Sequence, residues 1–236
     1  MFRSRCPVGE DERRWIEESL EWLTGQFGEP LLRAPVLLPD DPRFPRPYRG
    51  GEEQVQQVVR TVFAQLRVDR EAVTVELEHE DRAERELFAH LPRVAYSAQG
   101  AVGHYRRSAD GSPLVTLTDR LTADPVALVA VLAHELGHHR LLGEGRITAD
   151  RRDGEPLTDL LTVFFGAGHF NANAAFRFTQ GSTGWRRSSI GYLTQPMFGY
   201  ALARYAWLRG EREPGWARLL DANPRGYLRE GLRYLR

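Results

Sequence analysis

Two histidines lie four residues apart, at His134 and His138, in a run that is otherwise almost entirely apolar. An α-helix has about 3.6 residues per turn, so side chains at this spacing lie one above the other and can bind the same tetrahedral metal ion. Glu135 follows the first histidine and completes the pattern H-E-x-x-H. In this pattern the glutamate faces the open coordination position of a zinc ion, where a bound water needs a general base. The run therefore predicts a helix that carries a Zn²⁺ site.

The residues around this pattern predict a buried helix. Asp124 is a favourable N-cap, Pro125 suits the first helical position, and Gly143 is a natural end. Histidine and glutamate side chains are costly to bury in such a helix unless they are paired or bound to a metal. We therefore expect a metal site, and not histidines that only complete hydrogen bonds in the core. The apolar side chains of this helix are those of Val126, Leu128, Val129, Val131, Leu132 and Leu136.

Two acidic residues at the start of a second apolar helix are candidates for the third ligand. Glu155 and Asp159 are spaced as E-x-x-x-D. From about residue 124 to 166 the chain resembles the gluzincin metallopeptidases. That resemblance implies that Glu155 is the third ligand and that Asp159 hydrogen-bonds a ligating histidine. Pro156 disfavours helical geometry at the preceding residue, which predicts Glu155 at the helix cap and leaves Asp159 as a rival ligand.

The wider sequence is similar to a group of uncharacterised bacterial proteins that carry the same metal pattern. The similar segments include Gly-Tyr-Leu at 191–193 and Gly-Tyr-Ala-Leu-Ala at 199–203. This similarity implies no particular substrate.

Other residues near the pattern fit a metal site less well. The longer form H-E-x-x-H-x-x-G-x-x-H is absent, because Leu141 and Glu144 occupy its last two conserved places. His139 points about 100° around the helix from His138, which predicts that it lies at the surface or supports the ligands from behind. Glu144, together with Asp150 and His169, is a weaker candidate ligand.

A small sheet is expected just before the metal helix. Residues 73–78 alternate as a strand does, and 103–106 with 114–118 predict a hairpin closed by an Asp-Gly turn. The resemblance implies a zincin-like fold, in which an edge strand can bind an extended peptide, and 101–106 is the candidate edge. We therefore expect an α+β protein, mostly helical, with a small antiparallel-containing sheet packed on the active-site helix.

The N-terminal third predicts helices joined by a proline-rich connector. Apolar residues at helical spacing predict helices at 11–24 and 52–67, and six prolines between them, at 30–50, predict an extended segment. We expect an N-terminal helical region at 1–70 and a zincin-like catalytic domain at 71–236. The alternative is one continuous domain.

The C-terminal third predicts a turn and two helices. Glycines predict a structural turn at 166–173, residues 189–209 predict a helix interrupted at a proline, and 223–236 predict a last amphipathic helix. Tyr192 and Tyr200 in the first helix are possible donors to the oxyanion of a tetrahedral intermediate, although packing in the core is the stronger expectation for each ring.

Composition excludes several classes of partner. Lysine plus arginine and aspartate plus glutamate number 32 each, so no net charge favours nucleic acid or an anionic membrane. The single Cys6 excludes an internal disulfide and fits a reducing compartment or a fold held by a metal. No run approaches the roughly 20 apolar residues of a membrane span, and residues 1–9 are not followed by the apolar stretch of a secretory signal. These features predict a cytoplasmic protein.

The predicted function is zinc-dependent hydrolysis of a peptide or related amide bond in a peptide or protein substrate. His134, His138 and Glu155 would hold Zn²⁺ with one position open, and Glu135 would take a proton from the attacking zinc-bound water. The alternative is a catalytically silent zinc-binding regulatory or interaction protein on the same scaffold. Binding of both Glu155 and Asp159 to the metal would favour that alternative, because four protein ligands close the site.

Overall fold

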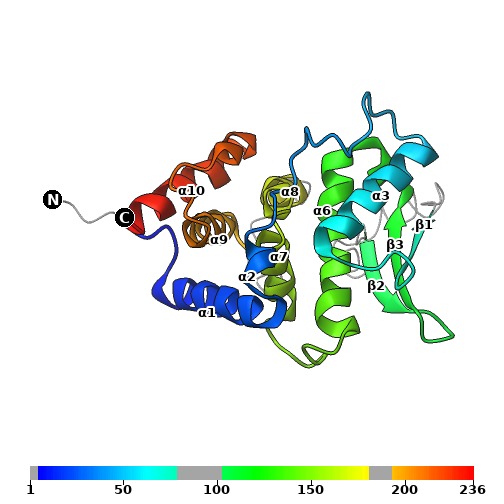
Figure 1. The fold of residues 1–236 in the computed structure, drawn as a ribbon, viewed down its shortest axis with the longest axis horizontal. Helices are drawn as coiled ribbons and strands as arrows, with labels where there is room; N and C mark the ends of the chain where they lie inside the picture. Colours follow the sequence, from blue (N-terminus) through cyan, green and yellow to red (C-terminus); the bar gives the residue numbers. More distant parts are fainter. Residues whose placement is uncertain (1–4, 79–102, 181–192) are drawn as a thin grey trace.

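The structure consists of helices packed around a small three-stranded sheet (Figure 1). It is a computed structural model that describes residues 5–78, 103–180 and 193–236. The predicted α+β class, mostly helical, is confirmed. The elements are α1 (Glu10–Phe27), α2 (Glu29–Leu32), α3 (Glu52–Leu66), β1 (Thr74–Glu78), β2 (Gly103–Arg107), β3 (Pro113–Thr118), a 3₁₀ turn (Asp119–Ala123), α6 (Pro125–His138), a π-helical turn (His139–Gly143), α7 (Gly154–Phe164), α8 (Gly168–Gln180), α9 (Gln195–Leu208), a second 3₁₀ turn (Gly215–Leu219) and α10 (Ala222–Tyr234).

The helix that carries the H-E-x-x-H pattern, α6, begins as its sequence predicts. The Asp124 carboxylate accepts hydrogen bonds from the amides of Val126 (3.0 Å) and Ala127 (3.1 Å), and Pro125 occupies the first turn. The cap satisfies amides that have no partner within the helix. At its other end, α6 continues into the π-helical turn, so the helical path reaches the predicted end at Gly143.

The sheet lies against α6 and has the predicted hairpin. Its strand order is β1-β3-β2, with β1 parallel and β2 antiparallel to the central strand. Thr74 pairs with Leu114 in the first ladder, and Gly103 pairs with Leu117 in the second. Within the described residues β2 is therefore an edge strand, as predicted for this segment. Residues 101 and 102 of the predicted edge lie outside the described ranges.

Helices enclose α6 on the sides that the sheet leaves free. In Figure 1, α3 and the sheet lie on one side of α6, and α7 and α8 lie on the other, with α9 and α10 beyond them. Helix α1 packs against α7 and α9. This arrangement places α7, which carries the predicted third ligand, directly beside the metal helix.

The proline-rich connector wraps along α3, as an extended segment can. Its backbone carbonyls at Pro35 and Arg43 accept hydrogen bonds from Gln65 and Gln57 of α3, each at 2.9 Å. The Tyr48 hydroxyl donates to a carbonyl in the 3₁₀ turn before α6 (2.8 Å). The connector thus joins α3 to the start of the metal helix.

Two predicted elements of the C-terminal third differ from the structure. The turn at 166–173 is shorter than predicted: Gly166 has a left-handed backbone (φ 77°), but α8 already begins at Gly168. Residues 189–192 of the helix predicted at 189–209 lie outside the described ranges, and α9 begins at Gln195, so Pro196 lies in its first turn and does not interrupt it. A proline is tolerated there, since the amide that it lacks has no helical partner.

The buried core contains residues from both sides of the predicted boundary at residue 70. Leu20 of α1 and Val62 of α3 belong to the same apolar cluster as Leu132 of α6 and Phe198 of α9, and all four are at most 3% exposed. Among the described residues, no helix has the length and apolar character to cross a membrane.

Helices α9 and α10 approach closely at Gly199, which yields a first prediction. A Cβ atom at Gly199 would collide with the Tyr227 side chain and lie 3.0 Å from the Leu228 amide nitrogen. We expect Gly199→Ala to lower the free energy of unfolding by about 1–3 kcal/mol, the usual cost of overpacking. Denaturant unfolding of the variant and the wild type measures this difference.

The matched control is Gly226→Ala in α10. A Cβ atom at Gly226 meets nothing within 4 Å, and the residue is exposed. Alanine is favoured over glycine in helices, so this variant should be more stable than the wild type by about 0.5–1 kcal/mol. Equal stability of the two variants would contradict the close packing of α9 on α10.

Candidate metal centre

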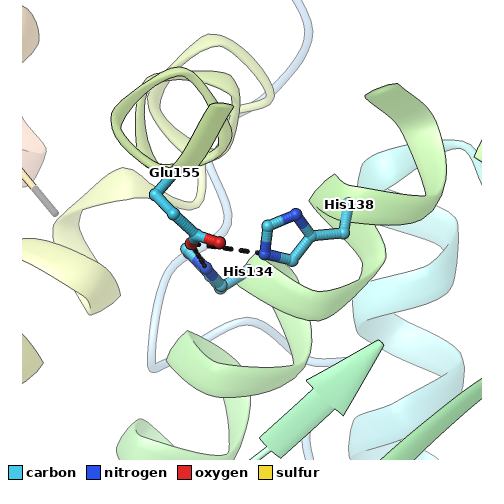
Figure 2. Close-up of side chains that lie close together, drawn as sticks. All are labelled: His134, His138 and Glu155. Carbon is cyan, nitrogen blue, oxygen red and sulfur yellow. Dashed lines mark hydrogen bonds and ion pairs between the residues drawn. The ribbon is translucent and has the colours of Figure 1, made fainter. Parts of the chain in front are cut away.

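Three side chains from α6 and α7 meet at one point (Figure 2). The Glu155 Oε2 atom lies 3.1 Å from His134 Nε2 and 3.4 Å from His138 Nε2, and the three ligand atoms lie within 4.8 Å of one another. Ligand atoms bound tetrahedrally at zinc distances of about 2.0–2.1 Å are separated by roughly 3.3 Å. The group can therefore hold one metal ion, and its nitrogen–oxygen distances fit a tetrahedral centre.

A glycine allows α7 to reach the metal helix. Gly137 lies directly before His138, and a Cβ atom there would be 2.8 Å from the Thr158 side chain of α7. The sequence analysis assigns no role to this glycine, because its need becomes visible only when the two helices are packed. Close approach at Gly137 brings the first turn of α7 over the two imidazoles.

Each histidine is held at its Nδ1 atom, with its Nε2 atom directed toward Glu155. His134 Nδ1 lies 2.9 Å from Asp159 Oδ1, and a carboxylate only accepts hydrogen bonds, so Nδ1 carries the proton. His138 Nδ1 lies 3.4 Å from Thr158 Oγ1, whose own hydroxyl donates to the Gly154 carbonyl at 2.8 Å. The Thr158 oxygen therefore accepts from His138. Both bonds select the tautomer whose lone pair is on Nε2.

Asp159 lies behind His134 and outside the group that can hold a metal. It is 2% exposed, and its second oxygen, Oδ2, accepts a hydrogen bond from the Leu193 amide (2.9 Å). Of the two predicted rivals for the third ligand, the structure brings Glu155 to the Nε2 atoms and places Asp159 on Nδ1 of His134.

Glu155 is the second residue of α7 and not its cap, which corrects the position predicted from Pro156. Asp153 occupies the cap, and Pro156 lies in the first turn. The amides of this turn have no partners within a helix, so proline loses no hydrogen bond there. The penalty on the residue before proline is outweighed at this helix start.

The carboxylates favour positive charge at the site. Burial lowers the pKa of His134, but its hydrogen bonds to Asp159 and Glu155 outweigh that effect and raise the pKa to about 10. Burial raises the pKa of Glu155, but the bonds to His134 and His138 lower it overall. The same carboxylates that hold a proton on His134 would favour a divalent cation between the imidazoles.

Glu135 follows the candidate ligand His134 in α6 and lies under the edge strand. The residue is 7% exposed, and no hydrogen bond to its carboxylate comes from a described residue. A Cβ atom at Gly103 of β2 would be 3.2 Å from Glu135 Cγ and 2.5 Å from Val131 Cγ1. Glycine at 103 therefore lets the edge strand pass directly over Glu135.

Tyr105 of β2 is a neighbour of the site that the sequence analysis missed. Its ring stacks on that of His138, with centroids 6.5 Å apart and planes inclined by 21°, and its hydroxyl is 3.4 Å from His139 Nδ1. His139 is 7% exposed, so the predicted surface position is wrong, and its contact is with Tyr105. A Cβ atom at Gly143 would collide with the Tyr105 hydroxyl, which explains glycine in the π-helical turn.

The weaker candidate ligands lie elsewhere. Glu144 forms ion pairs with Arg140 and Arg146, and the exposed Asp150 is outside the metal group. His169 is 1% exposed, and burial lowers its pKa to about 3. None of the three adds a ligand to the site.

The predicted oxyanion donor Tyr200 is also corrected. Its ring is fully buried, and its hydroxyl donates to Glu17 Oε1 of α1 at 2.5 Å. The hydroxyl therefore links α9 to α1 and serves packing, which was the stronger expectation. Tyr192 lies outside the described residues.

Comparisons of the chain with protein-family models, with curated proteins and with solved structures give no match. What the site can bind therefore follows from its own donor atoms. Two imidazole nitrogens and one carboxylate oxygen are a common three-ligand set for zinc, which leaves a fourth position for water or substrate.

This donor set predicts one Zn²⁺ bound per chain. His134→Ala and His138→Ala should each abolish tight binding, and Asp159→Asn should weaken it by about 10–100-fold, because the amide no longer orients His134 as a carboxylate does. Competition with a chromophoric chelator measures the affinities. His104→Ala is the control, since His104 is exposed on β2 and outside the metal group. Equal affinity of the His134→Ala variant and the wild type would exclude this centre.

Proposed function

We propose that the protein is a zinc-dependent metallopeptidase with a zincin-like fold. The observation that carries this proposal is Glu135, which follows His134 in α6, is 7% exposed and has no hydrogen-bond partner among the described residues, while its charge contributes to the raised pKa of His134. A metal held only for stability needs no carboxylate in that place. A hydrolase needs one to accept a proton from water.

The residues of the site would divide the reaction between them. Zn²⁺ bound there would act as a Lewis acid and lower the pKa of water toward about 7. His134, His138 and Glu155 would hold the ion, while Asp159 keeps His134 in the required tautomer. Glu135 would accept the proton of the attacking water and deliver it to the leaving amine.

The edge strand supports a peptide as the substrate. β2 pairs with β3 on one side only in the described part of the chain, and Gly103 brings its backbone against Glu135. An extended peptide that adds to such an edge gains main-chain hydrogen bonds regardless of its sequence. Its backbone would then run past the carboxylate and the metal group. The sheet beside α6 and the glutamate on α7 also agree with a zincin-like arrangement.

The alternative of a silent zinc-binding scaffold requires a closed site. Structural zinc is almost always bound by four protein ligands. Within the described ranges the group contains three, and Asp159, the most obvious fourth, is bonded to His134 Nδ1 and the Leu193 amide. This geometry favours the enzyme over the scaffold.

Replacement of the general base tests the proposal. Glu135→Gln should retain Zn²⁺ and lose about 10²–10⁴-fold in turnover, because the amide cannot take the proton. Cleavage of a mixed peptide library, followed by mass spectrometry, measures turnover whatever sequence the enzyme prefers to cleave. Glu76→Gln is the control, since Glu76 is exposed on β1. Full activity in the Glu135→Gln variant, or in wild type stripped of metal, would refute the peptidase.

A second test concerns the edge strand. Gly103→Val should displace β2 from Val131 and Glu135, so we expect a lower kcat/KM with little change in metal affinity. His104→Val is the matched control, because it adds the same β-branched side chain at the next, exposed position of the strand. If both variants cleaved peptides equally well, β2 would have no part in substrate binding.

A further inference from the structure

The N-terminal helix α1 contacts the segment that leads into the third ligand. Trp15 Nε1 donates a hydrogen bond of 2.8 Å to Asp153 Oδ2, across a sequence separation of 138 residues. Figure 1 shows α1 beside α7, in agreement with their packing contacts. Glu155 follows Asp153 by two residues, so this hydrogen bond is made just before the candidate ligand in the chain.

Asp153 occupies the N-cap of α7, but its side chain does not cap the helix. One oxygen, Oδ1, accepts from Arg151 Nε at 2.7 Å, and Oδ2 accepts from Trp15 and from Arg151 Nη2 at 3.1 Å. The Arg151 guanidinium lies 5.3 Å from the ring centroid of Trp22, which is also on α1. The Asp153 carboxylate thus connects α1 to the segment before α7. An N-cap carboxylate usually accepts hydrogen bonds from the first amides of its own helix instead.

The first turn of α7 needs such external support. The first amides of any helix lack partners within it, and Pro156 has no amide proton at all. The Glu155 side chain is 44% exposed, so few neighbours fix it. Within α7 the turn is closed by the Leu157 amide on the Asp153 carbonyl (3.0 Å). The position of Asp153 therefore determines where the backbone of Glu155 lies.

We propose that Trp15 is a positioning residue for the third ligand. Its hydrogen bond fixes Asp153 against α1 and so holds Glu155 within reach of the two imidazoles. This inference rests on the metal centre of the proposed function and not on its turnover. Because coupling is reciprocal, metal bound at Glu155 also stabilises the Trp15–Asp153 hydrogen bond. Helix α1 then not only packs on the hydrophobic core but also positions a ligand of the metal centre.

Zinc affinity of two matched variants tests the proposal. Trp15→Phe keeps an aromatic ring and removes the N–H donor, so we expect an affinity about tenfold lower, at the small end of losses for residues that orient a ligand. Trp22→Phe makes the same change on the same helix and keeps a ring face for Arg151, so its affinity should equal that of the wild type. Equal affinity in Trp15→Phe and wild type, or equal losses in both variants, would overturn the proposal.

A double-mutant cycle distinguishes positioning from general loss of stability. Asp153→Ala removes the acceptor, and if Trp15 acts through that acceptor, adding Trp15→Phe should cost no further affinity. Additive losses in zinc affinity would show that Trp15 acts by another route and would overturn the role assigned to this bond.

A spectroscopic test measures the coupling in the wild-type protein itself and uses Trp15→Phe only to assign the signal. The chain has five tryptophans, whose indole N–H signals are separated from other amide signals in an NMR spectrum. The Trp15 signal, assigned by its absence in Trp15→Phe, should shift on addition of Zn²⁺, while that of Trp207 on α9 should not. An unchanged Trp15 signal in zinc-loaded protein would overturn the coupling and leave the metal centre standing. If the wild type took up no Zn²⁺, the centre itself would fail.

Discussion

The candidate centre depends on the cost of enclosing polar groups within apolar helices. His134 and Asp159 are only 6% and 2% exposed. Such groups must be paired or bound to a cation, because burying them alone costs on the order of several kcal/mol. Helix α7 supplies both carboxylates that face His134, at Glu155 and Asp159, so α7 must pack on α6. Helices α1 and α9 in turn pack against α7 and so stabilise its position on α6.

Local sequence patterns were sufficient to predict the helix, the hairpin and the pair of histidines. The histidine spacing, the Asp124 cap and the apolar run each involve residues that are close together in the sequence. They can therefore be recognised without knowing how distant elements pack. The resemblance added Glu155, and the structure brings its carboxylate to both Nε2 atoms. The resemblance also predicted an edge strand at 101–106, and β2 at Gly103–Arg107 is an edge among the described strands.

Features that depend on packing between distant elements could not be predicted in this way. Gly103 and Gly137 resemble ordinary glycines until β2 and α7 are placed against α6. Tyr200 was a plausible donor by residue type, but the orientation of α9 directs its hydroxyl to Glu17. Tyr105 lies within a predicted strand, and nothing in the strand pattern indicates which helix residue its ring will contact. These failures share one cause, because residue type and spacing do not specify partners across elements.

The three ligands are held by contacts that do not involve a metal. Asp159 orients His134, Thr158 accepts from His138, and the start of α7 is fixed through Asp153 ahead of Glu155. The entropy of ordering these side chains is lost on folding, so little remains to oppose metal binding. A centre with an open position needs this order more than a closed one, because no fourth protein ligand limits its geometry. The contacts behind the candidate ligands would therefore help a three-ligand centre to retain a metal ion without a fourth protein ligand.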